Sequence, residues 1–225
     1  MTQTTRVDLL RHGECEGAQS IYRGIIDSPL SKDGWETMNK AVVSVVSDWD
    51  VIITSPKQRC RRYAMALAED LMRPFEINSG FREINFGRWE GLTFRDVWKA
   101  EADNVKAFYS DPESNPHGGE SVAQMTDRVM AAWAEILQRH RGKRILLVNH
   151  GGIMRVLLSE LLSIPMTSVS KMNVPYGCLT RFSVFFDEKV SNKAVSNEAV
   201  SNEKASDGKE NEQYHPMMEF HNKAG

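Results

Sequence analysis

The sequence has few cysteines and no long hydrophobic run. Its three cysteines, Cys15, Cys60 and Cys178, are scattered, and no two of them form a CxxC pair that would indicate a zinc site or a redox couple. No stretch approaches the roughly 20 apolar residues of a membrane helix, and the N-terminus lacks a charged segment followed by a long apolar run. We therefore predict reduced thiols in a cytoplasmic protein that does not bind membranes.

The chain also lacks an excess of positive charge. Lysine and arginine number 28 against 30 aspartate and glutamate residues, and the formal net charge is -2. A protein without a global positive field has no long-range attraction for nucleic acid, so nucleic acid is not an expected partner. Any anion that binds has to be held by a local cluster of basic groups.

What the sequence does contain is an alternation of short apolar strands and longer amphipathic helices. Its 225 residues, 41% of them hydrophobic, suit a single α/β domain. Buried parallel strands are predicted at Arg6–Arg11, Val51–Thr54 and Arg144–Val148. Helical spacing of apolar residues is found at Gln58–Leu71, Phe94–Tyr109, Ser121–His140 and Ile153–Leu162. This order predicts an α/β three-layer sandwich, with a mostly parallel sheet and helices on both faces.

A polar repeat interrupts this pattern near the C-terminus. The tripeptide Val-Ser-Asn returns three times between Lys189 and Ser206, which is too short and too polar to build a core. We expect one domain over residues 1–225 with a solvated insertion at about residues 188–213, joining edge strands at Thr180–Phe186 and Met217–Phe220. An edge strand near Phe182 would allow pairing across a homodimer.

Two of the predicted strands end in a histidine next to glycine. Arg11, His12 and Gly13 follow the first strand, and the run NHGG, with His150 and Gly151, follows the strand at Arg144–Val148. Ligands of open α/β sheets bind beyond the carboxyl ends of the strands, and an NHGG turn that opens a helix points backbone N–H groups at an anion. If the two strands are neighbours, the histidines meet.

Basic and acidic residues after other elements extend this cluster. Arg59 opens the helix after Val51–Thr54, and guanidinium groups match phosphate oxygens in a bidentate way, so arginines and histidines around one crevice predict a phosphate site. The alternative reading of KQRCRR is a solvated basic face, on which Arg61 and Arg62 would lie. Glu83, in the run REINFGRWEG, is placed to hold a carboxyl near the crevice, unless that run is a plain surface loop.

Taken together, these motifs resemble the histidine phosphatase superfamily, also called phosphoglycerate mutase-like. The resemblance extends over nearly all of the chain between Arg6 and Phe186, and the motifs occur in the expected order. They are RHGE, RGIIDSPLSKDG, SPKQRC, REINFGRWEG, HGGES and NHGG.

The resemblance implies a phosphomonoester hydrolase that works through a phosphohistidine and needs no metal or cofactor. His12 would be the nucleophile, with its second ring nitrogen held as a donor by a backbone carbonyl. Glu83 would protonate the leaving oxygen, and a protonated His150 would help to hold the phosphoryl group. The other implied residues of the phosphate site are Arg11, Arg59, Arg23, Gly24 and Gly151.

Several motifs are similar in wording to α-ribazole-5′-phosphate phosphatases, which implies a role in cobalamin nucleotide-loop assembly and a small phosphomonoester as the partner. The alternatives are a broad-specificity phosphatase of sugar phosphates and nucleotides and, less favoured, a phosphoglycerate mutase. A metal site built on the two histidines and a non-enzymatic phosphate-binding scaffold are the other classes to test. Contacts to the rest of the substrate are expected from Tyr22, Arg23, Trp89 and the Asp111–Ser121 loop.

Overall fold

The sheet at the centre of the molecule has six strands in the order β3-β2-β4-β1-β5-β6. The computed structural model describes residues 4–45, 48–186 and 214–221. Four strands are parallel, and β5 and β6 run antiparallel at one side of the sheet. The strands are β1 (Thr4–Arg11), β2 (Val51–Thr54), β3 (Phe75–Ile77), β4 (Arg144–Asn149), β5 (Leu179–Phe186) and β6 (Tyr214–Phe220).

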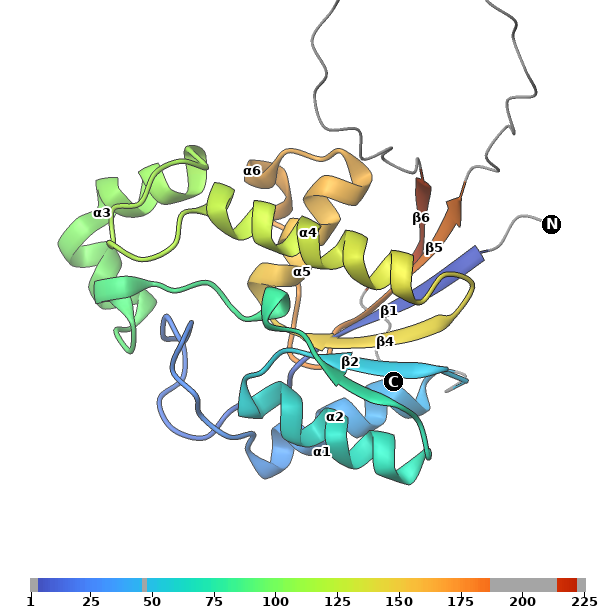
Figure 1. Ribbon diagram of the computed structural model, residues 1–225. Helices are drawn as coiled ribbons and strands as arrows, with labels where there is room; N and C mark the ends of the chain where they lie inside the picture. Colours follow the sequence, from blue (N-terminus) through green and yellow to red (C-terminus); the bar gives the residue numbers. More distant parts are fainter. Residues whose placement is uncertain (1–3, 46–47, 187–213, 222–225) are drawn as a thin grey trace, which may run out of the picture.

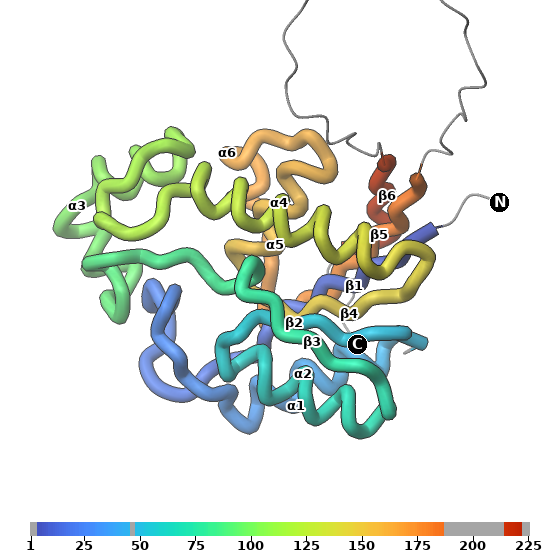
Figure 2. The backbone as a smooth tube through the Cα atoms, in the orientation of Figure 1, coloured from blue at the N-terminus to red at the C-terminus, as the bar shows by residue number. Residues whose placement is uncertain are grey.

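Helices cover both faces of this sheet, as Figure 1 shows. One face packs against α1 (Lys32–Val43) and α2 (Gln58–Asp70), and the other against α4 (Val122–Arg139) and α5 (Gly151–Leu162). The remaining helices, α3 (Phe94–Ser110) and α6 (Met166–Val169), lie beyond α4 and α5, where the tube view separates them from the sheet (Figure 2). The predicted three-layer α/β architecture is therefore confirmed.

The sequence pattern explains why α4 lies where it does. Ser121 caps the helix through a reciprocal pair of hydrogen bonds with Gln124, which satisfies backbone donors of the first turn. Its apolar residues recur every three or four positions, so Val129, Trp133 and Ile136 all fall on one face and are fully buried. This helix is the support behind the loop that carries Glu83.

The predicted strands and helices are found within a few residues of their expected ends. Five elements were not predicted. They are α1, whose buried face has only a few apolar residues, the three-residue edge strand β3, the four-residue α6, and two 3-10 helices, η1 (Ser79–Phe81) and η2 (Gly87–Trp89). Within the described residues, no helix is long and apolar enough to cross a membrane.

One prediction about the sheet edge was wrong. The strand at Thr180–Phe186 is not an edge strand, because β5 pairs with β1 on one side and with β6 on the other, and Phe182 is fully buried. Pairing of this strand across a homodimer is therefore blocked by β6. The predicted insertion at about 188–213 lies outside the described residues.

Candidate active site

The two strand-end histidines lie together because their strands are neighbours. In the parallel pair of β1 and β4, Arg11 is in register with Asn149, so the next residue of each strand, His12 and His150, leaves the sheet at the same point. The centroids of the two imidazole rings are 5.3 Å apart, with an angle of 65° between the ring planes. The structure thus places both histidines at the carboxyl end of the parallel strands.

His12 is held as a neutral ring with one free lone pair. Its Nδ1 lies 2.7 Å from the backbone oxygen of Gly13, and since a carbonyl only accepts, Nδ1 carries the proton and Nε2 keeps its lone pair. Burial, together with the guanidinium groups of Arg59 and Arg11, lowers the pKa of His12 well below its usual value. An unprotonated Nε2 is what a nucleophilic histidine requires.

Gly13 has a packing reason to be glycine. A Cβ atom at this position would lie 2.0 Å from the backbone oxygen of Gly34, so no side chain fits between the turn after β1 and the start of α1. The close approach of these two backbones fixes the turn that aims His12.

His150 is fully buried and is also neutral in the free site. The Nε of Arg59 donates to its Nδ1 at 3.3 Å, so the proton is on Nε2, which donates to the hydroxyl of Ser55 at 2.7 Å. Burial and the nearby Arg59, His12 and Arg11 lower the pKa of His150 well below its usual value. This differs from the protonated imidazole that the resemblance implied, because the free site already concentrates positive charge around a desolvated ring.

Arg59 is fixed by the backbone of the loop that precedes α1. Its terminal nitrogens donate to the backbone oxygens of Ile26 at 2.6 Å and Gly24 at 2.9 Å. Gly24 cannot be larger, since a Cβ there would lie 2.4 Å from the backbone oxygen of Ile84. The same loop caps the start of α2, where Asp27 accepts from the Gln58 amide at 2.8 Å.

The other arginines of the run KQRCRR lie at the surface and not at the crevice. Arg61 and Arg62 are exposed on the surface of α2, as the alternative reading of KQRCRR required for these two residues. Among the basic residues of this run only Arg59 is buried, 1% exposed.

Arg11 lies against a loop that the sequence did not identify. Its guanidinium donates to the backbone oxygen of Val174 and lies over the ring of Tyr176, 4.4 Å from the ring centroid. Tyr176 also contacts His12, at 5.6 Å between ring centroids. The Nε of Arg11 is buried and has no hydrogen-bond partner among the residues that the structure describes, which leaves a donor for an anion. No strand or helix signal marks this loop in the sequence.

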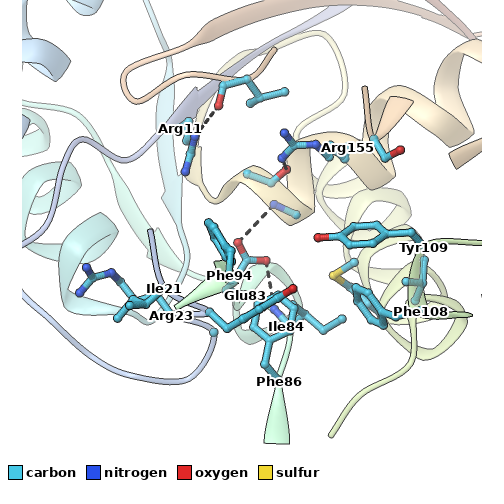
Figure 3. Close-up of a pocket in the computed structure, with 18 of the residues that line it drawn as sticks. Arg11, Ile21, Arg23, Glu83, Ile84, Phe86, Phe94, Phe108, Tyr109 and Arg155 are labelled. Carbon is cyan, nitrogen blue, oxygen red and sulfur yellow. Dashed lines mark hydrogen bonds between the residues drawn. The ribbon is translucent and has the colours of Figure 1, made fainter. Parts of the chain in front are cut away.

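Glu83 reaches the site from the other side of the crevice. Its two carboxyl oxygens accept from the backbone amides of Ile84 at 3.0 Å and Gly152 at 3.2 Å (Figure 3). A Cβ at position 152 would lie 2.4 Å from Oε1 of Glu83, so the second glycine of NHGG is what lets the carboxyl approach α5. Gly151 precedes it at the first position of α5 and lines the same cavity.

These groups open into one cavity of about 1210 Å³, above the roughly 300–1,000 Å³ of typical ligand pockets. Arg11, His12, Arg59 and Glu83 line its inner end, and Arg23, anchored to Ser28 at 2.7 Å, lies on its wall. The wall also carries many apolar and aromatic side chains, and Phe94, Ile84 and Phe86 lie around Glu83 (Figure 3). These apolar and aromatic side chains include Ile21, Tyr22, Ile84, Phe86, Phe94, Phe108, Tyr109, Met125 and Met166.

Two expected substrate contacts are not on this wall. Trp89 is fully buried in the core and does not line the cavity. Of the Asp111–Ser121 loop only Pro112 lines the cavity. His117 of this loop turns away from the cavity and lies among Phe86, Trp89 and other aromatic rings. Among the described residues, no three His, Cys, Asp or Glu side chains come together in a group that could hold a metal ion.

Comparison with known families agrees with this arrangement of histidines and arginines. The sequence profile of the histidine phosphatase superfamily (branch 1) matches residues 7–196. The chain belongs to this superfamily. This histidine phosphatase is 32% identical over 160 residues to the uncharacterized phosphatase PhoE of Bacillus subtilis, covering 70% of this chain and 77% of that protein.

Other phosphatases are about as similar. The glucosyl-3-phosphoglycerate phosphatase of Mycolicibacterium vanbaalenii is 31% identical over 169 residues, with 71% of this chain and 75% of that protein covered. The adenosylcobalamin/alpha-ribazole phosphatase of Escherichia coli is 26% identical over 182 residues, with 80% and 90% covered.

Solved structures share the fold. The alpha-ribazole phosphatase from Shigella flexneri superposes with a TM-score of 0.67 at 27% identity, over 79% of this chain and 89% of that one. The relatives in sequence and the neighbour in structure are all named phosphatases, so the chain is a phosphatase of this superfamily.

Proposed function

We propose that this histidine phosphatase hydrolyses α-ribazole 5′-phosphate through a phosphohistidine at His12. The observation that supports the substrate most strongly is the aromatic and apolar wall beside the charged end of the cavity. α-Ribazole 5′-phosphate combines a dianionic phosphate, a ribose and a flat apolar benzimidazole. The basic groups of the lining suit the phosphate, and its aromatic rings suit the benzimidazole.

The first step is an in-line attack of Nε2 of His12 on phosphorus. The bond from phosphorus to the ribose oxygen breaks, and that oxygen takes a proton from Glu83. Water then attacks the phosphohistidine, gives its proton to Glu83 and releases inorganic phosphate, which restores both groups. General acid–base help of this kind contributes about 10²- to 10⁴-fold in rate.

Arginine side chains stabilise the charge that spreads over the phosphoryl oxygens. Arg11 offers its unpartnered Nε, and Arg59 lies beside both histidines, so positive charge is in place before the substrate binds. The charge of a bound dianion favours the protonated form of His150, which is neutral in the free site. Ser55 accepts from His150 and keeps its ring in place meanwhile.

The apolar part of the wall selects an aromatic leaving group. Phe94 and Tyr109 both line the cavity while 49% and 47% of their surface remains exposed, so their rings offer faces to a ligand. Offset or edge-to-face contacts with an aromatic ring contribute about 0.5–1.5 kcal/mol each beyond area burial. A sugar phosphate or a phosphoglycerate gains nothing from these rings.

One observation favours a second candidate, a phosphomonoester that carries a carboxylate. Arg155 lines the cavity, donates only to backbone oxygens, of Gly151 at 3.2 Å and Met172 at 3.4 Å, and forms no ion pair within the described residues. Figure 3 shows it between Arg11 and Tyr109. A carboxylate near the phosphate would pair with this guanidinium.

A panel of substrates tests the proposal. We expect the highest kcat/KM for α-ribazole 5′-phosphate, ahead of 3-phosphoglycerate, fructose bisphosphate and AMP. Phe94→Ala should lower kcat/KM for α-ribazole 5′-phosphate by about 3- to 10-fold and leave glycerol phosphate unchanged. The matched control is Trp98→Ala, since Trp98 is as exposed on the same helix but does not line the cavity.

The same panel identifies the second candidate. Preference for 3-phosphoglycerate, lost in Arg155→Met, would replace α-ribazole phosphate by a carboxylate-bearing substrate. Similar kcat/KM values across the panel would contradict both specific substrates and leave a broad phosphatase.

A further inference from the structure

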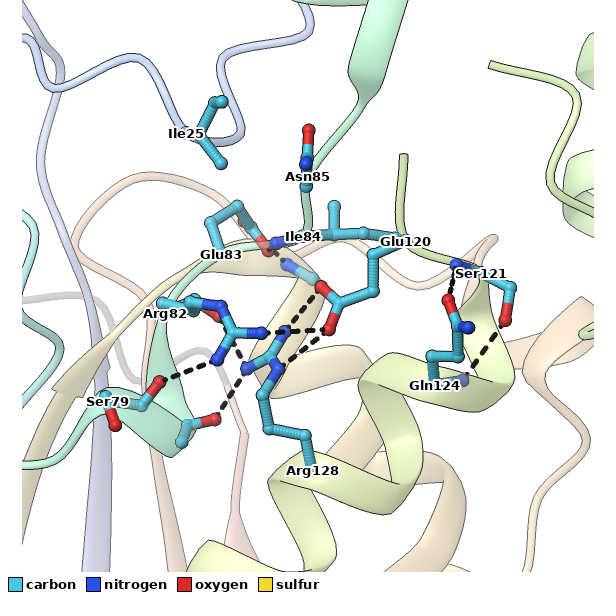
Figure 4. A network of polar contacts seen from close by, with 12 residues as sticks. Ile25, Ser79, Arg82, Glu83, Ile84, Asn85, Glu120, Ser121, Gln124 and Arg128 are labelled. Atoms are coloured by element: carbon cyan, nitrogen blue, oxygen red, sulfur yellow. Dashed lines mark hydrogen bonds and ion pairs between the residues drawn. The ribbon is translucent and has the colours of Figure 1, made fainter. Parts of the chain in front are cut away.

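A buried ion pair outside the cavity holds the segment that carries Glu83. Arg128 of α4 pairs with Glu120, with Nε 2.8 Å from Oε1 and Nη2 2.7 Å from Oε2 (Figure 4). The two side chains are only 13% and 12% exposed. A bidentate pair at this depth fixes the orientation of the guanidinium plane.

The remaining nitrogen of Arg128 contacts the chain immediately before Glu83. Its Nη1 donates to the backbone oxygens of Gly80 at 2.6 Å and Arg82 at 3.0 Å. On the other side of Glu83, the backbone amide of Glu120 donates to the oxygen of Asn85 at 2.8 Å. The pair thus binds the segment on both sides of the carboxyl group.

We propose that Arg128 and Glu120 are positioning residues for Glu83, which set the distance from its carboxyl to the leaving oxygen. Neither residue lines the cavity, so neither contacts the substrate. Within the described part of the chain, the Glu83 side chain accepts hydrogen bonds only from the backbone amides of Ile84 and Gly152, which orient the carboxyl. The backbone just before Glu83 is held by Arg128 of α4 instead. A small misplacement of a catalytic group is enough to lower a rate severely. This inference rests on the proposed role of Glu83 as the acid.

The expected signature of a misplaced acid is a dependence on the leaving group. An alkyl phosphate needs its leaving oxygen protonated, whereas p-nitrophenyl phosphate releases a good leaving group and needs little protonation. Loss of a structural contact alone would slow both reactions equally. Glu83 also activates the water that hydrolyses the phosphohistidine, a step common to both substrates, so kcat contains that step, whereas kcat/KM reports only the steps up to release of the leaving group. The ratio of the two kcat/KM values therefore separates positioning from stability.

The test is Arg128→Lys, which keeps the charge but cannot reach four acceptors from one nitrogen. We expect kcat/KM for an alkyl phosphate to fall about 5- to 30-fold and kcat/KM for p-nitrophenyl phosphate to change less than about twofold. Glu120→Gln, which weakens the pair and keeps the backbone contact to Asn85, should shift the ratio in the same direction by less. Arg139→Lys is the matched control, because Arg139 lies roughly three turns along the same helix and pairs with Glu76 and Glu135 instead.

The background variant Glu83→Gln separates the two proposals. If Glu83 is the acid, Glu83→Gln alone shows the leaving-group dependence. Adding Arg128→Lys to Glu83→Gln should then lower the rate for the alkyl phosphate by less than about a further twofold. Equal losses on both substrates in Arg128→Lys and Glu120→Gln, with the dependence still present in Glu83→Gln, would overturn the positioning role. A Glu83→Gln enzyme without this dependence would overturn the role of Glu83 in catalysis, and the present inference with it.

Discussion

Mild acid should destabilise the free enzyme through its two active-site histidines. His12 and His150 are buried beside arginines, and the pKa of each is lowered well below its usual value. In the unfolded chain both return to about 6.5. Below that pH the unfolded state binds protons that the folded state excludes. The free energy of unfolding is therefore unaffected by titration of the two histidines above about pH 6.5, and it falls as the pH drops from there toward the pKa values of the folded protein.

The size of this effect follows from the number of groups. Each histidine lowers the free energy of unfolding by about 1 kcal/mol as the pH falls from about one unit above its unfolded pKa to about one unit below it, so the two together account for roughly 2–3 kcal/mol. Typical domains have a free energy of unfolding of only about 5–15 kcal/mol. The loss should therefore be visible in an ordinary denaturation experiment.

Urea denaturation followed by tryptophan fluorescence, in buffers without phosphate, measures this difference. The control is the double variant His12→Asn, His150→Asn, which cannot titrate at either position. His117, whose burial also lowers its pKa, is present in both proteins and cancels. Wild type should lose roughly 2–3 kcal/mol more than the double variant over this range. Equal losses in the two proteins would show that the histidines are not held neutral and would refute this reasoning.

Three further predictions concern the cavity. Arg59→Lys should lower kcat/KM about 100-fold or more for every phosphomonoester, because lysine cannot contact Gly24, Ile26 and His150 at once; a loss under tenfold in steady-state kinetics would contradict this. Gly152→Ala should slow alkyl phosphates more than p-nitrophenyl phosphate, because its Cβ would displace the carboxyl of Glu83. EDTA should leave turnover unchanged, and an EDTA-sensitive rate restored by a divalent cation would reject metal-free phosphoryl transfer.

Much of the fold follows from local patterns in the sequence. Strand and helix positions depend on the period of apolar residues, which is a local property, and the elements with long apolar runs were predicted within a few residues. Residues next to a strand end are likewise placed by local sequence. This is why His12 and His150 were identified as candidates from the motif in which each stands.

Other features depend on contacts that no local pattern encodes. The edge position expected for Phe182 was wrong because β6, far along the chain, covers β5. Tyr176 was missed because its loop has no periodic signal and reaches Arg11 only through the fold. Trp89 was expected at the substrate, but its bulk is better buried in the core. The neutral state of His150 depends on arginines that come together only in three dimensions.

The most direct test of the mechanism is to trap the covalent intermediate. Enzyme mixed with a phosphomonoester and quenched without acid should carry one phosphate on His12, located by mass spectrometry of its peptides, and His12→Asn should carry none. Phosphate on another residue, or turnover in His12→Asn close to that of wild type, would contradict a phosphohistidine at the end of β1.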